Sequence, residues 1–316
     1  MASKISVVMA CFNAAAHISR AIESVLSQGG VDLELIVVDD CSTDETVDLV
    51  ARLAGGDPRV RLLRQQQNGG PSAARNAGFR SATGDWLAII DADDAFAPDR
   101  LRQMLTAAEE HQLDFVFDQL VLYDAGARQE TGLAPATIDQ AHLDLRSLIR
   151  SERPGPVFRL GFLKPLIRRS FLESRDLRYR EDVRLAEDFM LYAEALLKGA
   201  RCELIATPGY VYTTQVGQSS GDRSAASHTI YDPRVRLGIA EALIADYADA
   251  SKEEMALLRL YREWQLRYVA IFNMSMLQRN RRFAAFIATA LRNPKAATQF
   301  VLTSSTFKRL RAVANR

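Results

Sequence analysis

The stretch Trp86-Leu-Ala-Ile-Ile-Asp-Ala-Asp-Asp94 joins a run of apolar residues to a cluster of acidic ones. Five apolar residues in succession are typical of a strand that is buried on both faces. Carboxylates two positions apart in a tight turn can face one hard cation, and Mg²⁺ and Mn²⁺ prefer oxygen ligands. Asp-rich segments also cap helices, so this stretch by itself leaves open both a metal site and a helix start before Pro98.

Three similar strands precede this one, and a helical segment follows each of them. The predicted strands are Lys4–Met9, Leu33–Val38 and Val60–Leu63. The helices that follow them are predicted to open at Asn13, at Thr43 or Asp44, and at Pro71, respectively. This alternation predicts an α/β fold with a mostly parallel, Rossmann-like sheet flanked by helices.

Ligands bind beyond the carboxyl ends of the strands in such sheets. Here Asp39-Asp40 and Asp91–Asp94 form two acidic clusters at strand ends. Converging carboxylates repel each other unless a cation or a donor-rich ligand lies between them. We therefore expect a metal or nucleoside site at this edge of the sheet.

The pattern changes along the rest of the chain. We expect a strand over Leu113–Tyr123, and then a helix over Leu185–Lys198 that starts near Glu187-Asp188 and is closed by Gly199. Two short strands over Cys202–Ala206 and Tyr210–Thr213 should follow. Helices broken by Pro233 and Pro294 follow. The predicted division is a domain over residues 1–224 and a helical, basic C-terminal region over residues 225–316.

Composition excludes several classes of protein. The 40 basic and 39 acidic side chains give a net charge of +1, so no basic field covers the whole surface as in a dedicated nucleic-acid binder. The three cysteines have spacings that match neither a zinc site nor a disulfide framework, which favours a reducing, cytoplasmic compartment. The apolar run Ile5–Phe12 is short for a signal peptide, and no run of about 18 apolar residues could span a membrane as a helix.

Five motifs, in this order, resemble those of the inverting GT-A glycosyltransferases of family 2, which use nucleotide-sugar donors. They are Ile5–Asn13, Glu34–Asp44, Asn68–Gly78, Asp91–Asp94 and Glu187-Asp188. The resemblance spans roughly residues 4–220, and the order of the motifs makes it more specific than any single one. Within the family, the chain is similar to the exopolysaccharide (succinoglycan-type) glucosyltransferases through Leu163–Leu172 and Gly209–Tyr212.

The resemblance implies a site for a donor nucleotide and its cation, Mg²⁺ or Mn²⁺. The residues that would contact them are Ala10, Phe12, Asn13, Asp40, Arg75, Asp91, Ala92 and Asp93. Phe12 would stack on the base where the family usually has tyrosine, and Asp40 would accept a hydrogen bond from the uracil imide. Asp93 would be the principal metal ligand beside Asp91. For Arg75, a salt bridge to a carboxylate at the sheet edge is an alternative that is compatible with a nucleotide contact.

Asp188 is the candidate general base. Inversion requires a carboxylate that deprotonates the acceptor hydroxyl on the face of the sugar opposite the departing nucleotide. A helix N-terminus favours the ionised form of Asp188, and an acidic pair that only complements the helix dipole is the alternative. His228, which follows the glycine-rich loop Gly217–Gly221, is a further candidate for contact with the metal or the donor phosphates.

The motifs together predict an enzyme, a hexosyltransferase. It would move a hexose, with glucose from UDP-glucose as the first choice, to a lipid-linked oligosaccharide in the synthesis of exopolysaccharide or another cell-surface polysaccharide. The Gln-x-x-Arg-Trp motif of processive family members is absent from the sequence, which favours the addition of one sugar per encounter.

Two other functions stay as alternatives, a sugar-phosphate nucleotidylyltransferase and a non-catalytic nucleotide-sugar-binding module. The first needs a glycine-rich loop with Arg and Lys after the first strand, and Ala10–Ala16 lacks it. A dinucleotide oxidoreductase would need G-x-G-x-x-G in the same place, which is also missing. Intact Asp93 and Asp188 speak against the binding module.

Charge is segregated along the chain. Residues 1–263 contain all 39 acidic side chains but only 30 of the 40 basic ones, a net charge of −9, and the remainder contains only basic charges. Between the basic residues, Phe283, Phe286, Ile287 and Leu291 recur at helical spacing. A basic amphipathic segment suits an anionic membrane surface, so we predict a cytoplasmic protein attached peripherally to the inner face of the cell membrane.

A second stripe of apolar residues precedes this segment. Its members, spaced alternately by four and three, are Leu257, Tyr261, Trp264, Tyr268 and Ile271. Such spacing predicts a packing seam, either against the catalytic domain or between two copies in a homodimer. Nucleic acid is not expected as a partner, because no stacking motif or recognition helix accompanies the basic charge.

Overall fold

The computed structural model describes residues 3–134, 142–155, 158–214 and 232–303. The chain forms two compact units. The first comprises Met1–Leu148 and Phe158–His228, and the second comprises Ile149–Val157 and Thr229–Arg316. Residues 215–231 lie outside the described part, so the boundary expected after residue 224 stays a prediction.

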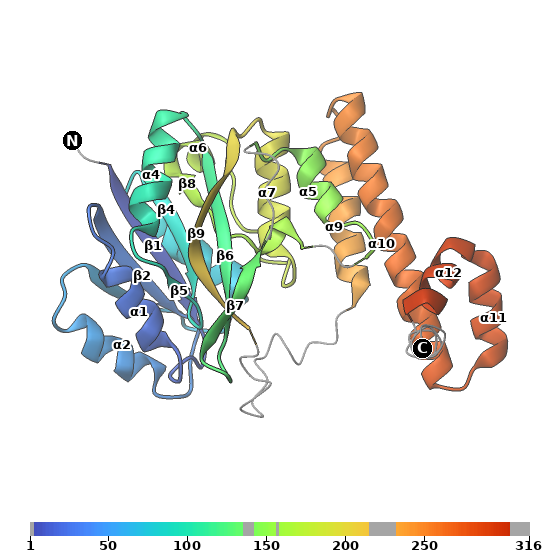
Figure 1. Ribbon diagram of the computed structural model, residues 1–316, viewed down its shortest axis with the longest axis horizontal. Coiled ribbons are helices and arrows are strands. Elements are labelled where there is room, and N and C mark those ends of the chain that lie inside the picture. Colours follow the sequence, from blue (N-terminus) through green and yellow to red (C-terminus); the bar gives the residue numbers. More distant parts are fainter. Residues whose placement is uncertain (1–2, 135–141, 156–157, 215–231, 304–316) are drawn as a thin grey trace. The chain divides into compact units, whose positions relative to one another are not determined.

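Four parallel strands form the first half of the sheet in the first unit (Figure 1). They are β1 (Lys4–Cys11), β2 (Asp32–Asp39), β3 (Val60–Arg64) and β4 (Trp86–Asp91), in the spatial order β3-β2-β1-β4. The helices between them are α1 (Ile18–Leu26), α2 (Thr46–Ala54) and α3 (Gly70–Ser81). The predicted alternation is confirmed, and its physical basis is that apolar strands joined by crossover helices pair in parallel.

The pairing register brings the carboxyl ends of three strands to one edge of the sheet. Cys11 of β1 lies opposite Asp39 of β2, and Ala10 lies opposite Asp91 of β4. Both acidic clusters that the sequence places after strands therefore flank the end of β1.

The three central strands behind this edge, β1, β2 and β4, are almost entirely buried. Ile5, Val7, Val8 and Met9 of β1 have no solvent exposure, so both faces of this strand are covered. Helix α3 packs closely against them, because a Cβ atom on Gly78 would lie 2.3 Å from Cγ1 of Val8. Only glycine permits this approach, and it sets the position of α3 beside the acidic edge.

The second half of the sheet mixes strand directions. Outward from β4 come β8 (Leu166–Arg168), β6 (Phe115–Asp124), β9 (Cys202–Thr214) and β5 (Ala95–Phe96), and β7 (Gln129–Ala134) pairs with β6. β8 is antiparallel to β4, with Ala88 opposite Leu166, whereas β6 and β9 are parallel. The chain that enters β8 therefore comes from the carboxyl end of β4, which brings Lys164 toward Asp91.

The two short strands expected over Cys202–Ala206 and Tyr210–Thr213 are one continuous strand, β9. Its register against β6 shifts around Gln119. Pro208 and Gly209 fit into this irregularity instead of ending the strand, because a bulge tolerates residues that weaken a regular ladder.

Loop contacts replace two expected helix starts. Helix α1 begins at Ile18 and α2 at Thr46, later than the predicted openings at Asn13 and at Thr43 or Asp44. The prediction that Asn13 caps α1 is wrong. Its Oδ1 accepts a hydrogen bond from the backbone N–H of Thr43 at 2.8 Å, which ties the loop after β1 to the loop after β2.

The remaining helices of the first unit are short. They are α4 (Arg100–Glu110), α5 (Leu145–Ser151, whose last residues belong to the second unit), the 3₁₀-helix η1 (Leu160–Phe162), α6 (Arg169–Ser174) and α7 (Glu187–Leu197). The helix expected to start at Glu187-Asp188 is confirmed as α7.

The second unit is helical, as predicted. It contains α9 (Pro233–Asp246), α10 (Lys252–Arg279), α11 (Phe283–Arg292) and α12 (Pro294–Thr303). Proline starts α9 and α12 because the first helical residue needs no N–H partner. Among the described residues, none of the helices is long and apolar enough to cross a membrane.

Part of the apolar stripe on α10 is used within the protein itself. Leu257 and Tyr261 are buried, and α10 packs along α9. The hydroxyl of Tyr268 donates a hydrogen bond to the carbonyl of Arg153 at 3.3 Å, also within the second unit. The homodimer stays a prediction.

Candidate active site

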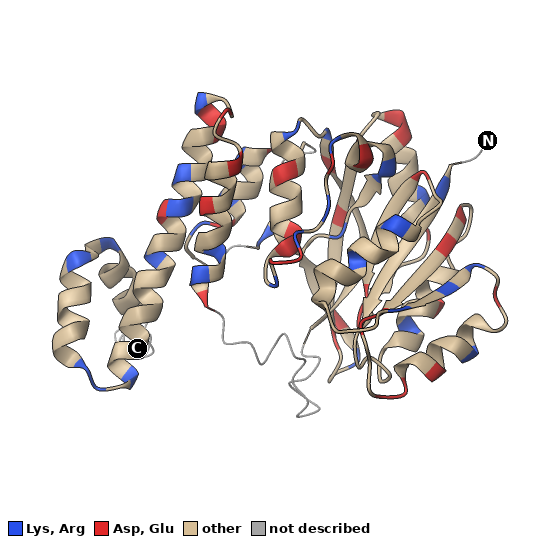
Figure 2. Cartoon of the chain, turned by 180° about the vertical axis from the view of Figure 1, so that it is seen from behind, with Lys and Arg blue, Asp and Glu red and all other residues tan. Residues whose placement is uncertain are grey.

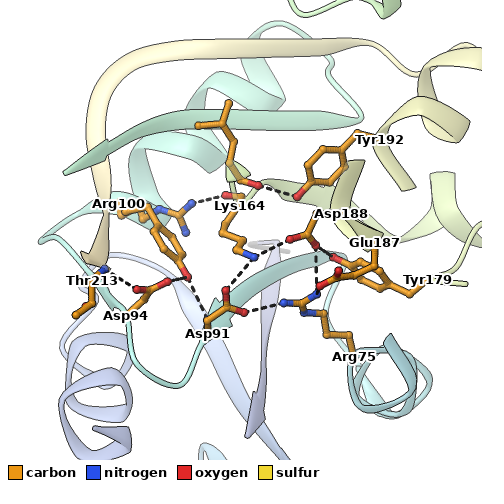
Figure 3. Close-up of polar contacts among 12 residues, drawn as sticks. Arg75, Asp91, Asp94, Arg100, Lys164, Tyr179, Glu187, Asp188, Tyr192 and Thr213 are labelled. Carbon is orange, nitrogen blue, oxygen red and sulfur yellow. Dashed lines mark hydrogen bonds and ion pairs between the residues drawn. The ribbon is translucent and has the colours of Figure 1, made fainter. Parts of the chain in front are cut away.

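Asp91, the last residue of β4, is paired with two cations. Its Oδ1 lies 2.7 Å from a terminal nitrogen of Arg75 on α3, and its Oδ2 lies 2.9 Å from Nζ of Lys164 (Figure 3). Burial favours the protonated acid, but the two cations outweigh it and hold the pKa of Asp91 well below its ordinary value. Asp91 is therefore ionised.

Asp188, in the first turn of α7, belongs to the same network. Its Oδ2 lies 2.7 Å from Nζ of Lys164, while its Oδ1 accepts a hydrogen bond from the hydroxyl of Tyr179 at 2.7 Å and lies 3.3 Å from Arg75. The side chain is buried. Three donors therefore surround this carboxylate at the N-terminus of α7.

Lys164 is the bridge between the two carboxylates, as Figure 3 shows. The residue is only 4% exposed. Burial alone would lower the pKa of its ammonium, but Asp188 and Asp91 raise it above its ordinary value. The lysine therefore remains charged in a place where an unpaired ammonium would not persist.

The network contains more acid than base. Arg75 also pairs with Glu187 at 2.9 Å, so two cations face the three carboxylates of Asp91, Glu187 and Asp188. The Nε of Arg75 is buried and has no hydrogen-bond partner among the described residues. The site thus keeps one negative charge in excess and one unused donor.

The two other acids of the Asp91–Asp94 cluster differ in role. Asp94 is buried and accepts hydrogen bonds from the hydroxyl of Tyr210 and the backbone N–H of Thr213, both at 2.7 Å. It fastens the turn after β4 to β9. Asp93 presents its backbone carbonyl to Arg20 at 2.8 Å, and its carboxylate makes no ion pair within the described ranges.

The carboxylate of Asp93 suits a divalent cation. Burial and the neighbouring charge of Asp91 raise its pKa, which means that a positive charge beside it would be stabilising. In the part of the chain that the structure describes, no group of three or more His, Cys, Asp or Glu side chains is placed to hold a metal. Mg²⁺ usually takes one or two protein carboxylates and completes its shell with phosphate and water, and Asp93 with the neighbouring Asp91 offers such a set. His228 lies outside the described residues.

The residues expected at the nucleotide base lie at the ends of β1 and β2. The backbone N–H of Asp40 donates to the carbonyl of Cys11 at 2.8 Å, which places Asp40 beside the chain that leads to Phe12. The Phe12 ring is 40% exposed. The carboxylate of Asp40 accepts hydrogen bonds from the N–H groups of Gly69 and Gly70, both at 2.8 Å, and burial raises its pKa.

These contacts show a role for Asp40 that the sequence did not reveal. It holds the turn that starts α3, the helix that carries Arg75. Each carboxylate oxygen has a second lone pair, so the predicted contact with a uracil imide is compatible with the turn and stays a prediction.

The structure brings together Arg75, Asp91 and Asp188 from three motifs that are distant in the sequence. It also adds Lys164 and Tyr179, which sequence reasoning missed. Lysine next to the apolar strand Leu166–Arg168 is a usable signal, because a buried ammonium requires acidic partners. Nothing in the local sequence distinguishes Tyr179.

The chain is similar to several known proteins. The model of the family described as "Glycosyl transferase family 2" matches residues 6–174. The chain is 40% identical over 223 residues to the succinoglycan biosynthesis protein ExoO of Rhizobium meliloti, covering 68% of this chain and 62% of that protein, which is less than two thirds of its length. It is 32% identical to ExoU of the same organism over 304 residues, covering 92% of this chain and 84% of ExoU.

The fold is shared with a solved structure. The crystal structure of Staphylococcus aureus TarS 1-349 in complex with UDP-GlcNAc has a TM-score of 0.62 and 20% identity, covering 87% of this chain and 73% of that one. This likeness confirms the predicted GT-A architecture.

Proposed function

Since the chain belongs to glycosyl transferase family 2, we propose that it transfers a hexosyl group, with inversion, from a UDP-sugar to a hydroxyl of a saccharide acceptor. The observation that carries this proposal is the bridge from Asp91 through Lys164 to Asp188. It joins an acidic strand end, suited to a nucleotide and its cation, to a buried carboxylate suited to act as a base.

Asp188 is the base in this proposal. The acceptor oxygen attacks the anomeric carbon, the bond from that carbon to the UDP oxygen breaks, and the proton of the acceptor hydroxyl passes to Asp188. A carboxylate has about four acceptor positions, and its three donors leave one for that hydroxyl. The electron pair of the broken bond leaves with UDP, so no protein nucleophile is required.

The leaving diphosphate is stabilised by positive charge. When bound, Mg²⁺ or Mn²⁺ would supply that charge, and Asp93 with Asp91 would hold the ion. Arg75 and Lys164 keep the Asp91 carboxylate ionised and oriented. The excess negative charge of the network supports this assignment, because a cation would balance it.

The choice of UDP rests on the edge residues and on a relative. Phe12 offers an exposed ring for stacking on a base, and Ala10, Asn13 and Asp40 lie around the same strand ends. TarS has been crystallised in complex with UDP and with UDP-GlcNAc. ExoO and ExoU are named as succinoglycan biosynthesis proteins, which supports a role in exopolysaccharide synthesis. Glucose as the sugar and a lipid-linked acceptor are further parts of the proposal.

The experiment is a UDP-release assay with a panel of UDP-sugars, saccharide acceptors, and Mg²⁺ or Mn²⁺. Replacing Asp188→Asn should lower the turnover by about 10²–10⁴-fold, because the proton acceptor is lost. Calorimetric binding of UDP should persist in this variant. Glu187→Gln is the matched control: it removes the same charge one residue away, and its loss should be far smaller.

Other outcomes distinguish the alternative functions. Near-normal turnover of Asp188→Asn would contradict the assignment of the base. Release of pyrophosphate from a nucleoside triphosphate would identify a nucleotidylyltransferase, and UDP-sugar binding without release under any condition would identify a binding module.

The C-terminal unit supports a location at the inner face of the cell membrane. Phe283, Ile287 and Leu291 recur every four residues on α11 and are 60%, 57% and 78% exposed. Phe286 points the other way and packs against Phe300, with ring centroids 5.5 Å apart. The structure thus leaves one apolar face of α11 uncovered by the described residues.

The surroundings of this face are basic. The chain contains no acidic residue after Glu263, and in Figure 2 the only charged positions coloured along α11 and α12 are basic ones. Arg281 and Arg282 precede α11 and Arg292 ends it. An apolar face flanked by cations alone is complementary to anionic lipid, with the ring of Phe283 at the acyl boundary and the arginines among the headgroups.

A further inference from the structure

Three aromatic side chains gather beside the candidate base. The ring of Phe162, in η1, lies 6.3 Å from the ring of Phe158 and 6.3 Å from that of Tyr212 on β9, centroid to centroid. Phe162 is 43% exposed, and the other two are partly covered. Large exposed apolar side chains are few among the described residues of the first unit, so this ring is not a routine part of the core.

The chain on both sides of Phe162 is attached to α7. On one side, a Cβ atom on Gly161 would lie 3.0 Å from Cβ of Phe189, the residue after Asp188. On the other side, the carbonyl of Leu163 accepts a hydrogen bond from the hydroxyl of Tyr192 at 2.7 Å. The residues on both sides of Phe162 therefore contact α7 in the turn that follows the candidate base.

Tyr212 links the same group to the acidic edge. Burial, together with the nearby carboxylate of Asp94, raises the pKa of its hydroxyl to about 12. The phenol is thus neutral, and its ring backs Phe162 on the side of the turn after β4. The aromatic group is thus connected to two elements: the residues beside Phe162 contact α7, which carries Asp188, and Tyr212 lies near the turn that carries Asp93 and Asp94.

Such a surface has the chemistry of a sugar-binding platform. One face of a pyranose presents C–H groups that are polarised by the ring oxygens, and these are attracted to the negative face of an aromatic ring. The hydroxyls at the rim of the sugar stay free for hydrogen bonds. A rigid exposed ring beside polar groups that converge on one point is typical of a site that orients a small polar ligand.

We propose that Phe162, supported by Phe158 and Tyr212, stacks on the sugar ring of the acceptor and presents its hydroxyl to Asp188. This rests on the proposed glycosyl transfer and adds the subsite that selects a saccharide rather than water as the acceptor. The base of the donor is expected at another place, beside Phe12 at the end of β1, so the two exposed rings serve different ligands.

The test uses saturation-transfer NMR on the full chain with UDP and either methyl β-D-glucopyranoside or cellobiose as the probe. In the wild type, saturation should reach the C–H protons of the sugar. Phe162→Ala should weaken this transfer at least about fivefold, as expected for the loss of one stacking contact of about 1 kcal/mol. Phe162→Leu, which keeps an apolar side chain without a ring, should show the same loss, and Phe162→Tyr should restore the signal.

Phe283→Ala is the matched control, because it removes another exposed phenylalanine from the second unit. It should leave the sugar signal unchanged. Wild-type transfer in both Phe162→Ala and Phe162→Leu, or no transfer in the wild type with either sugar, would overturn the stacking role.

Calorimetric titration with UDP separates this inference from the proposed function. The UDP affinity of all variants should equal that of the wild type within about twofold, because the ring does not contact the nucleotide. Failure of the wild type to bind UDP would overturn the proposed function, whereas retained UDP binding with an unchanged sugar signal in Phe162→Ala would overturn only the subsite.

Discussion

Arg75 and Arg100 are both buried arginines of the first unit, but their charges are balanced in different ways. Arg100 donates two hydrogen bonds to Asp118, at 2.7 and 2.8 Å, and its guanidinium lies 4.4 Å from the centroid of the Phe96 ring. Arg75 faces three carboxylates, of which Asp91 has a side chain that is 28% exposed.

The difference separates a structural ion pair from a candidate site. One cation with one bidentate acid, enclosed by aromatic rings, is balanced and has no charge left for a ligand. The network of Arg75 and Lys164 has a surplus carboxylate and a partly exposed acid, Asp91, at the edge of the sheet, which are properties of functional sites. Burial of charge is common to both, so burial alone does not identify the site.

The largest expected effect is on stability, at the ion pair of Arg100 and Asp118. Asp118→Ala leaves the guanidinium of Arg100 buried without its acid, which should cost about 3–5 kcal/mol in the free energy of unfolding. Chemical denaturation measures this loss, and the folded protein should still bind UDP. Asp57→Ala, which breaks a half-buried pair with Arg59, should lower the denaturation midpoint much less. Loss of UDP binding by folded Asp118→Ala would show that this pair is also part of the site.

The second largest effect is on catalysis, at the network of Arg75 and Lys164. Lys164→Met should lower the turnover by about 10²–10³-fold, because the Asp91 and Asp188 carboxylates lose the cation that fixes both. Lys164→Arg keeps the charge and should retain more activity. Turnover in the UDP-release assay and the denaturation midpoint are measured together. If Lys164→Met loses stability and keeps its turnover, the network is structural, as that of Arg100 is.

The smallest expected effect is on membrane binding, at the exposed apolar face of α11. Ile287→Asp should weaken binding to phosphatidylglycerol vesicles roughly tenfold, the equivalent of burying one aliphatic side chain, about 1.5 kcal/mol. Leu133→Asp, at an apolar side chain of similar exposure in the first unit, is the control. Co-sedimentation gives both affinities. Two results would argue against a membrane role for this face. One is that the wild type binds phosphatidylcholine vesicles as tightly as phosphatidylglycerol vesicles, and the other is that Ile287→Asp binds phosphatidylglycerol vesicles as tightly as the wild type does.

The parallel half of the fold was predictable because its signals are local. Apolar runs such as Trp86–Ile90 and the helical segments between them specify their own conformation, and the crossover rule supplies the topology. The merging of two expected strands into β9 was not predictable, because it depends on a bulge opposite Gln119 on another strand. The start of α1 depends likewise on a contact between two loops.

The candidate site divides in the same way. Asp91, Asp188 and Arg75 were identified because each lies in a motif of the family. Lys164 and Tyr179 were not, since their significance lies in carboxylates that are distant along the chain. The sequence also grouped Phe286 with Phe283 as one apolar stripe, whereas the structure turns Phe286 inward and leaves Phe283 outside.

The sequence by itself determined the order of strands and helices, the acids at the strand ends and the excess of basic charge at the C-terminus. These follow from hydrophobic periodicity and composition, which are properties of neighbouring residues. Only the tertiary structure decided which acids share a cation, which buried arginine is fully balanced by one acid, and which aromatic ring stays exposed. Those depend on antiparallel β8, which brings Lys164 between Asp91 and Asp188, and on the attachment of η1 to α7.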